Sequence, residues 1–284
     1  MKILLQNRPH LWSGGDQIQI IETAKVLNAD ISCKEEPDLS RYDVVILHHL
    51  AGYWTLLQYK NCIKYKKPYV LYTMFFETDS QVSREEMQEI YDNASVVVSF
   101  GDKELDRIRK YINPHREHIY IENGISDIFT FAPEKGKYVL IVARISKQKN
   151  IHKAIEVCKN LNLILRIIGY PSPMELDYYS YIRRLHSVES VDYQNMPEVY
   201  QGAQVNLSIS DMELDPLNFK EGLASGCNSI LAPTSITWEK YKDLANVRVL
   251  GNLEEQIKEL WNLPKQKTNL KSWWEVGEEW KKVL

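Results

Sequence analysis

The sequence predicts an α/β protein built from two doubly wound domains. Short β-type runs alternate with helical segments along the 284 residues. The runs are almost entirely apolar, as is typical of parallel strands that helices cover on both faces. The alternation pauses at a polar stretch, 131–136, and then starts again, and a chain of this length is long enough for two domains.

In the first half, the pattern predicts five strands and four helices in alternation. The strands are expected at 2–5, 43–48, 69–72, 95–99 and 119–121, and the helices at 16–27, 53–65, 84–92 and 102–111. In the second half, strands are expected at 138–143, 163–168, 204–209 and 229–232, with a helix at 151–159. We therefore expect a first domain at 1–131, a second at 132–265 and a separate tail at 266–284.

The tail is expected to form an amphipathic helix. Trp273, Val276 and Trp280 fall on one face of such a helix, and charged residues occupy the other. This pattern favours a helix that docks on the body of the protein.

Composition excludes several classes of function. The chain is 44% hydrophobic and 26% charged, as in soluble globular proteins, and its net charge of −3 argues against nucleic-acid binding. Four scattered cysteines without a CxxC pair predict reduced thiols, a cytoplasmic location and no zinc site. No apolar run approaches the roughly 20 residues of a membrane span. Basic residues in the first half leave a peripheral membrane contact open: Lys60, Lys64, Lys66 and Lys67.

The most informative stretch is 210–226, which follows the apolar run 204–209. Asp215 and Pro216 predict the start of a helix, since Asp caps free N–H groups and proline fits the first turn. Gly226 is expected to end this helix in a left-handed conformation. The positive end of such a helix attracts phosphate.

Two glutamates, Glu213 and Glu221, lie eight positions apart in this stretch. If the segment were wholly helical, eight residues at about 1.5 Å each would separate the carboxylates by roughly 12 Å. That separation exceeds the about 5–9.5 Å between glycosidase carboxylates. A loop could shorten it, so the spacing counts weakly against a hydrolase. The spacing fits better with a division of roles, in which each carboxylate binds a different part of one ligand.

A basic pair follows the first strand of the second half. Arg144 and Lys149 lie just past its carboxyl end, which is the edge where open α/β sheets bind ligands. A fork-shaped and a point-like cation there would suit a diphosphate. A solvated basic turn is an equally good interpretation of these two residues alone, and Lys147 is expected at the surface.

Two weaker signals lie near the N-terminus. Gly14 and Gly15 follow the first strand and open a helix, so that the backbone could approach a ligand closely, although a simple turn is the favoured interpretation. His48 and His49 end the second expected strand at the ligand edge. A histidine there could orient a hydroxyl or act as a base, and a structural role is at least as well supported.

Taken in order, these features resemble the retaining family-4 glycosyltransferases of the GT-B fold, over nearly the whole chain. The matching pieces are the Gly14-Gly15 pair, 121–125, 143–149, 167–169, the E-x7-E pair Glu213 and Glu221, and 224–226. The arginine–lysine spacing together with E-x7-E is the specific part. The resemblance implies two Rossmann-like domains facing across a cleft, with the last helix crossing back to the first domain.

The resemblance also implies roles for individual residues. Arg144 and Lys149 would hold the donor's diphosphate and stabilise the leaving group. Glu213 would contact the transferred sugar near the reacting carbon, and Glu221 would accept hydrogen bonds from the ribose. The remaining donor-binding positions would be Gly14, Gly15, Gly169, Leu217 and Asn218. The family needs no metal, and closure of its two domains favours transfer over hydrolysis.

The chain departs from the family in three places. The family often has Phe-Gly after the first glutamate, where this chain reads Leu-Asp-Pro-Leu at 214–217. Asp215 could bond a donor hydroxyl, but capping the helix is favoured. Thr73-Met74, followed by Glu77, replaces the usual first-domain histidine, which leaves His48, His49 or no histidine as the base. Asn150 replaces a glycine that usually follows the lysine.

The sequence therefore predicts a cytoplasmic, retaining glycosyltransferase without a cofactor. Its donor would be a UDP-, GDP- or ADP-sugar, and its acceptor a glycan, a lipid-linked molecule or another hydroxyl compound. Two alternatives stay open: a sugar-nucleotide epimerase or hydrolase of the same fold, and a non-catalytic sugar-nucleotide-binding module.

Overall fold

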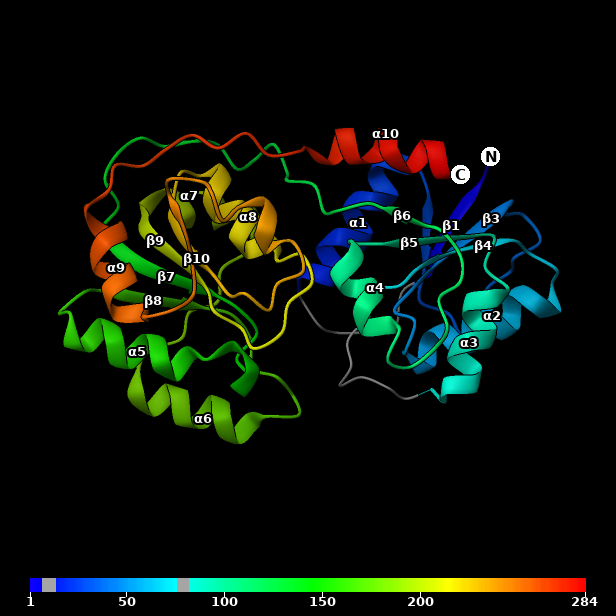
Figure 1. Ribbon diagram of the computed structural model, residues 1–284, viewed down its shortest axis with the longest axis horizontal. Coiled ribbons are helices and arrows are strands. Elements are labelled where there is room, and N and C mark those ends of the chain that lie inside the picture. The colour runs from blue at the N-terminus through cyan, green and yellow to red at the C-terminus, as the bar shows by residue number, and fades with distance from the viewer. Residues whose placement is uncertain (7–13, 76–81) are drawn as a thin grey trace. The chain divides into compact units, whose positions relative to one another are not determined.

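The computed structural model describes residues 1–6, 14–75 and 82–284, and it divides into two compact units (Figure 1). Unit 1 comprises Met1–Gly124 and Trp273–Leu284, and unit 2 comprises Ile125–Ser272. The division falls before the polar stretch at 131. Phe129 packs into the core of unit 2, and Phe131 lies against Gly226.

Unit 1 contains a six-stranded parallel sheet in the order β2-β1-β3-β4-β5-β6. The strands are β1 (Ile3–Gln6), β2 (Asp30–Ser32), β3 (Val44–His48), β4 (Tyr69–Tyr72), β5 (Val96–Ser99) and β6 (His118–Tyr120). The five expected strands are confirmed within one residue at each end. Strand β2 was not predicted, because it is only three residues long and has a polar residue at each end.

Four helices connect these strands: α1 (Gly15–Leu27), α2 (Tyr53–Lys64), α3 (Arg84–Asp92) and α4 (Asp102–Ile108). Helix α3 begins with a capping box, in which Ser83 and Glu86 satisfy each other's backbone N–H groups. Helix α4 ends before the predicted 111. The buried Glu104 carboxylate accepts hydrogen bonds from the Thr73 hydroxyl and from the amides of Phe75 and Phe100, and so ties α4 to the ends of β4 and β5.

Unit 2 contains a five-stranded parallel sheet in the order β11-β10-β9-β7-β8. Its strands are β7 (Tyr138–Val142), β8 (Leu165–Ile168), β9 (Ala203–Ser208), β10 (Asn228–Leu231) and β11 (Val247–Val249). Its helices are α5 (Ile151–Asn160), α6 (Leu176–Leu185), α7 (Met196–Gly202), α8 (Leu217–Ala224) and α9 (Leu253–Asn262), with short 3-10 turns η2 (Lys147–Lys149), η3 (Tyr193–Asn195) and η4 (Trp238–Lys240).

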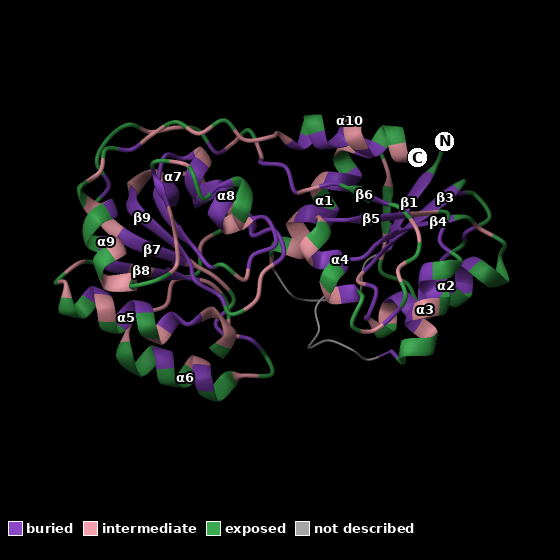
Figure 2. Ribbon diagram, viewed as in Figure 1, coloured by how far each residue is buried: buried purple, intermediate pink, exposed green. Residues whose placement is uncertain are grey.

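Both sheets are buried between helices, and the helices expose their outer faces (Figure 2). The strands are nearly all apolar for this reason, since side chains on both faces of each strand enter a core. Two parallel, helix-covered sheets confirm the predicted α/β class with Rossmann-like units.

The last helix, α10 (Trp273–Val283), belongs to unit 1, as the family resemblance implied. Trp273, Val276 and Trp280 are buried, and the Trp280 ring meets Tyr72 edge-on at 5.4 Å. Helix α10 packs on α1 at Gly277, where a side chain would collide with Val26. Among the helices of the described residues, none combines the length and apolar character needed to cross a membrane.

Candidate active site

In the unit 2 sheet, the order in which strands are added changes direction between β7 and β9. Strand β7 pairs with β8 on one side and with β9 on the other, so the loops that leave the carboxyl ends of β7 and β9 run apart. Such a switch point is where open α/β sheets bind ligands. Both segments with predicted catalytic residues lie there: 143–150 follows β7, and 209–216 follows β9.

At this switch point, the ammonium of Lys149 and the carboxylate of Glu213 form an ion pair. The Ser210 hydroxyl donates a 2.7 Å hydrogen bond to the same oxygen of Glu213. The side chains of Lys149 and Glu213 are 16% and 14% exposed, so the pair is shielded from bulk water yet within reach of a ligand. The structure thus brings together two of the four charged residues that were predicted to bind the donor, Arg144, Lys149, Glu213 and Glu221.

Side chains from the β7 loop also hold the β9 loop in place. The Asn150 amide donates to the carbonyl of Ile209 at 3.0 Å and to the Asp211 carboxylate at 2.7 Å. The backbone carbonyl of Gln148 accepts from the Asp211 amide at 2.9 Å, and its side-chain amide donates to the Met212 carbonyl at 2.9 Å. The two loops therefore form one hydrogen-bonded assembly.

Helix α8 starts at Leu217, beside the Glu213 loop, but its start differs from the prediction. The capping position is Pro216, whose side chain accepts no hydrogen bond from the first turn. The prediction that Asp215 caps the helix is wrong. Its buried carboxylate instead pairs with Lys220 at 2.7 Å, because a buried lysine five residues along offers a full charge.

Asn218 lies in the first turn of α8 and fixes the helix to the sheet. Its side-chain amide donates to the carbonyl of Val142, at the end of β7, at 2.9 Å. Its oxygen accepts from the amide of Phe219 at 2.9 Å. The side chain of Asn218 thus aligns the start of α8 with the loop that carries Arg144 and Lys149.

Glu221 lies further along α8 with a buried carboxylate. It accepts hydrogen bonds from Tyr200 at 2.8 Å and from Tyr193 at 3.1 Å. Burial raises the pKa of Glu221 to about 7, although the two tyrosine bonds lower it. The structure therefore holds the second glutamate of the E-x7-E pair among aromatic hydroxyls of η3 and α7.

Two other predicted residues lie at the same sheet edge. Arg144 is exposed at the start of the β7 loop. Gly169 follows β8, and a Cβ atom there would lie 1.8 Å from the carbonyl oxygen of Ala143, so glycine is needed for β8 and β7 to end side by side.

The predicted residues of unit 1 form a separate group. Gly14 precedes α1 as its capping position and Gly15 is the first helical residue. His49 lies 4.0 Å from the Asp16 carboxylate, at the α1 start. His48 is buried, with Nδ1 3.3 Å from the Gln6 carbonyl, and burial lowers its pKa to about 3, which makes it a weak base. Glu77 lies outside the described residues.

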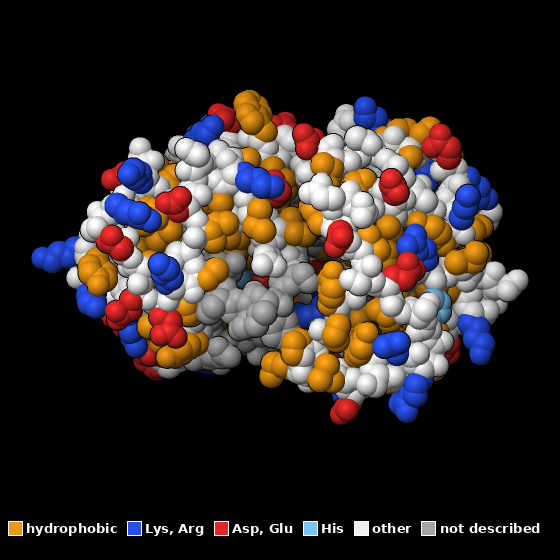
Figure 3. All heavy atoms as spheres, turned by 180° about the vertical axis from the view of Figure 1, so that it is seen from behind, with side chains coloured by type: hydrophobic (Ala, Val, Ile, Leu, Met, Phe, Trp, Pro, Cys, Tyr) orange, Lys and Arg blue, Asp and Glu red, His pale blue; other side chains and the backbone are white. Residues whose placement is uncertain are grey.

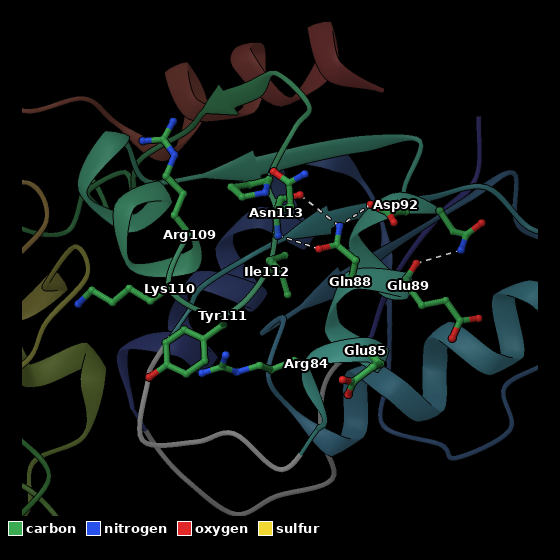
Figure 4. A pocket seen from close by; sticks show the side chains of 12 residues that line it. Arg84, Glu85, Gln88, Glu89, Asp92, Arg109, Lys110, Tyr111, Ile112 and Asn113 are labelled. Carbon is green, nitrogen blue, oxygen red and sulfur yellow. Dashed lines mark hydrogen bonds between the residues drawn. The ribbon is translucent and has the colours of Figure 1, made fainter.

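An open groove of about 980 Å³ in unit 1 runs between α3 and the segment after α4 (Figure 4). Its side chains engage one another: Gln88 bonds Asp92 and Asn113, and Arg84 lies over the Tyr111 ring at 5.4 Å. None of the predicted site residues lines this groove.

Sequence reasoning missed the residues that support the site. Predicted residues are contacted by Ser210, Tyr200 and Lys220, and Asn150 holds the loop that carries Glu213. The substitution of Asn150 for the usual glycine was one available signal. No cluster of metal-ligating side chains occurs among the residues that the structure describes.

Two Rossmann-like parallel sheets, with cations and carboxylates at the switch point of the second, agree with the GT-B fold. Residues 126–246 match the model of the family described as glycosyl transferases group 1. This match covers Arg144, Lys149, Glu213 and Glu221. This part of the chain is thus similar to that family, and the fold of both units is shared with solved glycosyltransferases.

Solved structures with the same fold cover nearly the whole chain. HepE from Anabaena in complex with UDP-glucose is 13% identical, with 92% of this chain and 88% of that chain covered and a TM-score of 0.75. Sucrose-phosphate synthase from Thermosynechococcus elongatus is 12% identical, with 100% and 94% covered and a TM-score of 0.76. AviGT4, a glycosyltransferase involved in avilamycin A biosynthesis, is 14% identical, with 99% and 96% covered and a TM-score of 0.69. A search of curated proteins finds none that matches this chain.

Proposed function

We propose that the protein is a retaining glycosyltransferase that moves a sugar from a nucleoside-diphosphate sugar to a hydroxyl acceptor without a metal. The observation that carries this proposal is the Lys149–Glu213 pair at the unit 2 switch point, beside the start of α8. A cation suits the diphosphate and a carboxylate suits the hydroxyls of the sugar, so the pair matches the two halves of such a donor.

Arg144 and Lys149 act on the leaving group. As the bond between the sugar and the diphosphate breaks, negative charge grows on the diphosphate oxygen. Two cations at fixed positions stabilise this charge without reorganising, which is commonly the largest contribution to catalysis. The first-turn amides of α8, at Leu217 and Asn218, add donors at a partially positive helix end.

The two glutamates divide the rest of the donor between them. Glu213 contacts the transferred sugar near C1, and Glu221 accepts hydrogen bonds from the ribose. In the transfer, the C1–oxygen bond to the diphosphate breaks, and the acceptor oxygen bonds to C1 from the same face. The proton of the acceptor hydroxyl passes to the departing phosphate oxygen, so that no separate base is needed and the anomeric configuration is retained.

The donor is best sought first among uridine nucleotides, because the structurally similar HepE has been solved with UDP and with UDP-glucose. GDP- and ADP-sugars are the next candidates. Unit 1, with His49 beside Asp16, supplies acceptor-binding residues for a glycan, a lipid-linked molecule or another hydroxyl compound. The enzyme works in the cytoplasm, where a peripheral membrane contact would bring it to a lipid-linked acceptor.

The test is the release of nucleoside diphosphate from a panel of UDP-, GDP- and ADP-sugars, with and without acceptors. Glu213→Gln should abolish release, whereas Lys147→Ala, an exposed lysine in the same turn η2, should leave it unchanged. NMR of the product should show the donor's anomeric configuration, and EDTA should not change the rate.

Three results would redirect the proposal. Free sugar or an isomer formed without an acceptor would indicate a hydrolase or an epimerase of this fold. Tight diphosphate binding without turnover on any acceptor would indicate a binding module. Turnover that Glu213→Gln leaves unchanged would show that the chemistry lies elsewhere.

A further inference from the structure

Glu213 lies between two anchored parts of its loop. On its N-terminal side, Asp211 and Met212 are bonded to Gln148 through the Asp211 amide and the Met212 carbonyl, both at 2.9 Å. On its C-terminal side, the Leu214 carbonyl accepts from the amide of Ile236 at 2.9 Å. The position of the Glu213 backbone thus depends on both flanks.

The C-terminal flank contains a buried ion pair. Asp215 accepts from the Lys220 ammonium at 2.7 Å and from the Thr237 hydroxyl at 2.9 Å. The side chains of Lys220 and Asp215 are 3% and 0% exposed. The pair joins the Glu213 loop, helix α8 and the segment before η4 in one contact.

A buried pair of this kind is a costly way to stabilise a fold. Taking both charges out of water costs about as much as their attraction returns, and apolar residues of similar size often serve stability equally well. The pair also carries no net charge, so it adds less to the potential around Arg144 and Lys149 than a single charge would. The pair does supply a defined geometry, because a charge-assisted hydrogen bond is directional and fixes the loop at one place on α8.

We infer that Asp215 and Lys220 are positioning residues, which hold the Glu213 carboxylate at the distance from Lys149 that sugar transfer requires. This inference rests on the proposed function. It assigns to the pair an effect on the rate of transfer that exceeds its effect on stability. A displacement of about 1 Å in a reacting group can cost roughly 100-fold in rate.

The experiment compares four proteins: the wild type, Lys220→Met, the double variant Asp215→Leu/Lys220→Met, and Lys220→Arg. Lys220→Met removes the opposite charge from the buried Asp215 carboxylate, so it should lower the urea midpoint of unfolding strongly. The double variant replaces both charges with apolar groups and should recover much of that midpoint. Lys220→Arg keeps the charge and should retain most of the activity.

The decisive measurement is kcat and KM for the donor in the double variant. We expect kcat to fall roughly ten- to 100-fold with little change in KM, because the lost positioning acts in the transition state. Ile257→Ala, which truncates a fully buried core residue in α9, is the control for lost stability and should keep kcat near the wild-type value.

Two outcomes would overturn the inference separately. If the double variant regains wild-type kcat together with its stability, the pair is structural and the inference falls while the proposed function stands. If wild-type protein releases no nucleoside diphosphate from any sugar nucleotide, the proposed function falls, and the inference falls with it.

Discussion

Lys149 and Glu213 pair their charges across the switch point of unit 2, one from the loop after β7 and the other from the loop after β9. The pair combines opposite effects on a ligand. In the proposed function, the lysine attracts the diphosphate of the donor, whereas the glutamate repels it and binds the sugar. Binding and transfer should therefore respond differently when each partner is changed.

We expect Glu213→Gln to bind free UDP more tightly than the wild type while losing transfer. The change removes a negative charge near the diphosphate and frees the Lys149 ammonium. A gain of about 1 kcal/mol, or roughly fivefold in affinity, corresponds to one charge pair at a few ångströms in a partly exposed site. Isothermal titration calorimetry with UDP measures it.

Lys149→Met provides the opposite case and should weaken the affinity for UDP by a similar or larger factor. Lys147→Met, two residues earlier in the same turn, controls for the general positive charge of the loop and should bind UDP nearly as the wild type does. Weaker UDP binding by Glu213→Gln would show that the glutamate does not face the diphosphate.

Glu221 should make the stability of the protein depend on pH. Burial raises its pKa in the folded state to about 7, against about 4.3 in an unfolded chain, so the folded state binds more protons between these values. The stability that the protonated carboxyl contributes is complete below about pH 4 and is lost as the pH rises through 7. Glu221→Gln removes this titrating carboxyl. Between pH 5 and pH 8, the free energy of unfolding of the variant should therefore rise relative to that of the wild type, by up to about 3 kcal/mol.

Urea unfolding at several pH values tests this dependence. Tyr200→Phe removes a hydrogen bond that lowers the Glu221 pKa, so it should raise that pKa further and extend the dependence to higher pH. Tyr178→Phe is a matched control, because Tyr178 is a buried tyrosine of the same unit whose hydroxyl bonds His152. A flat difference between wild type and Glu221→Gln would place the carboxylate in contact with water.

How much the sequence predicts depends on the range of the interaction. Apolar runs and glycine or proline signals are local, so most strands, the E-x7-E spacing and the buried face of α10 follow from the sequence. The Lys149–Glu213 pair could be anticipated as well, because parallel strands bring their carboxyl ends to one edge.

The rest depends on which side chains the packed fold buries together. Asp215 has the local sequence of a helix cap, but its carboxylate forms an ion pair with the buried Lys220 and the cap position is Pro216. Tyr200 carries no signal that its hydroxyl would bind Glu221. Such partners are set by tertiary packing, which no short pattern encodes.

Asn150 offers a test of a backbone effect. It has φ 54° and ψ 30°, a left-handed conformation that glycine and asparagine tolerate and alanine does not. Asn150→Gly should lose the side-chain bonds to Ile209 and Asp211, whereas Asn150→Ala should lose these bonds and also strain the backbone. We expect alanine to be less stable than glycine by about 1 kcal/mol, the reverse of their order in a helix interior.

Thermal unfolding of the two variants measures this difference. Asn160, the last residue of α5, is the control position, because it lies inside the helix bounds and alanine should be the more stable substitution there. If Asn150→Ala proves more stable than Asn150→Gly, the left-handed turn after Lys149 is not required.

Gly277 tests the docking of α10 on unit 1. In an isolated helix, alanine is more favourable than glycine by about 1 kcal/mol. Here a Cβ atom at position 277 would lie 2.8 Å from the Cβ of Val26 in α1, and an atom so near the backbone has little freedom to move away. Gly277→Ala should therefore destabilise the protein by about 1–3 kcal/mol, as overpacking does.

Gly251→Ala is the matched control, since a Cβ there meets its nearest neighbour, the Gln256 amide, at an ordinary 3.7 Å. Urea unfolding followed by tryptophan fluorescence measures both variants, and the buried Trp273 and Trp280 should report exposure of α10 by a red shift. Equal stability of the two variants would mean that α10 lies further from α1 than the 2.8 Å approach indicates. A red shift of the tryptophan fluorescence in Gly277→Ala alone would show that α10 detaches when its contact with Val26 is overpacked.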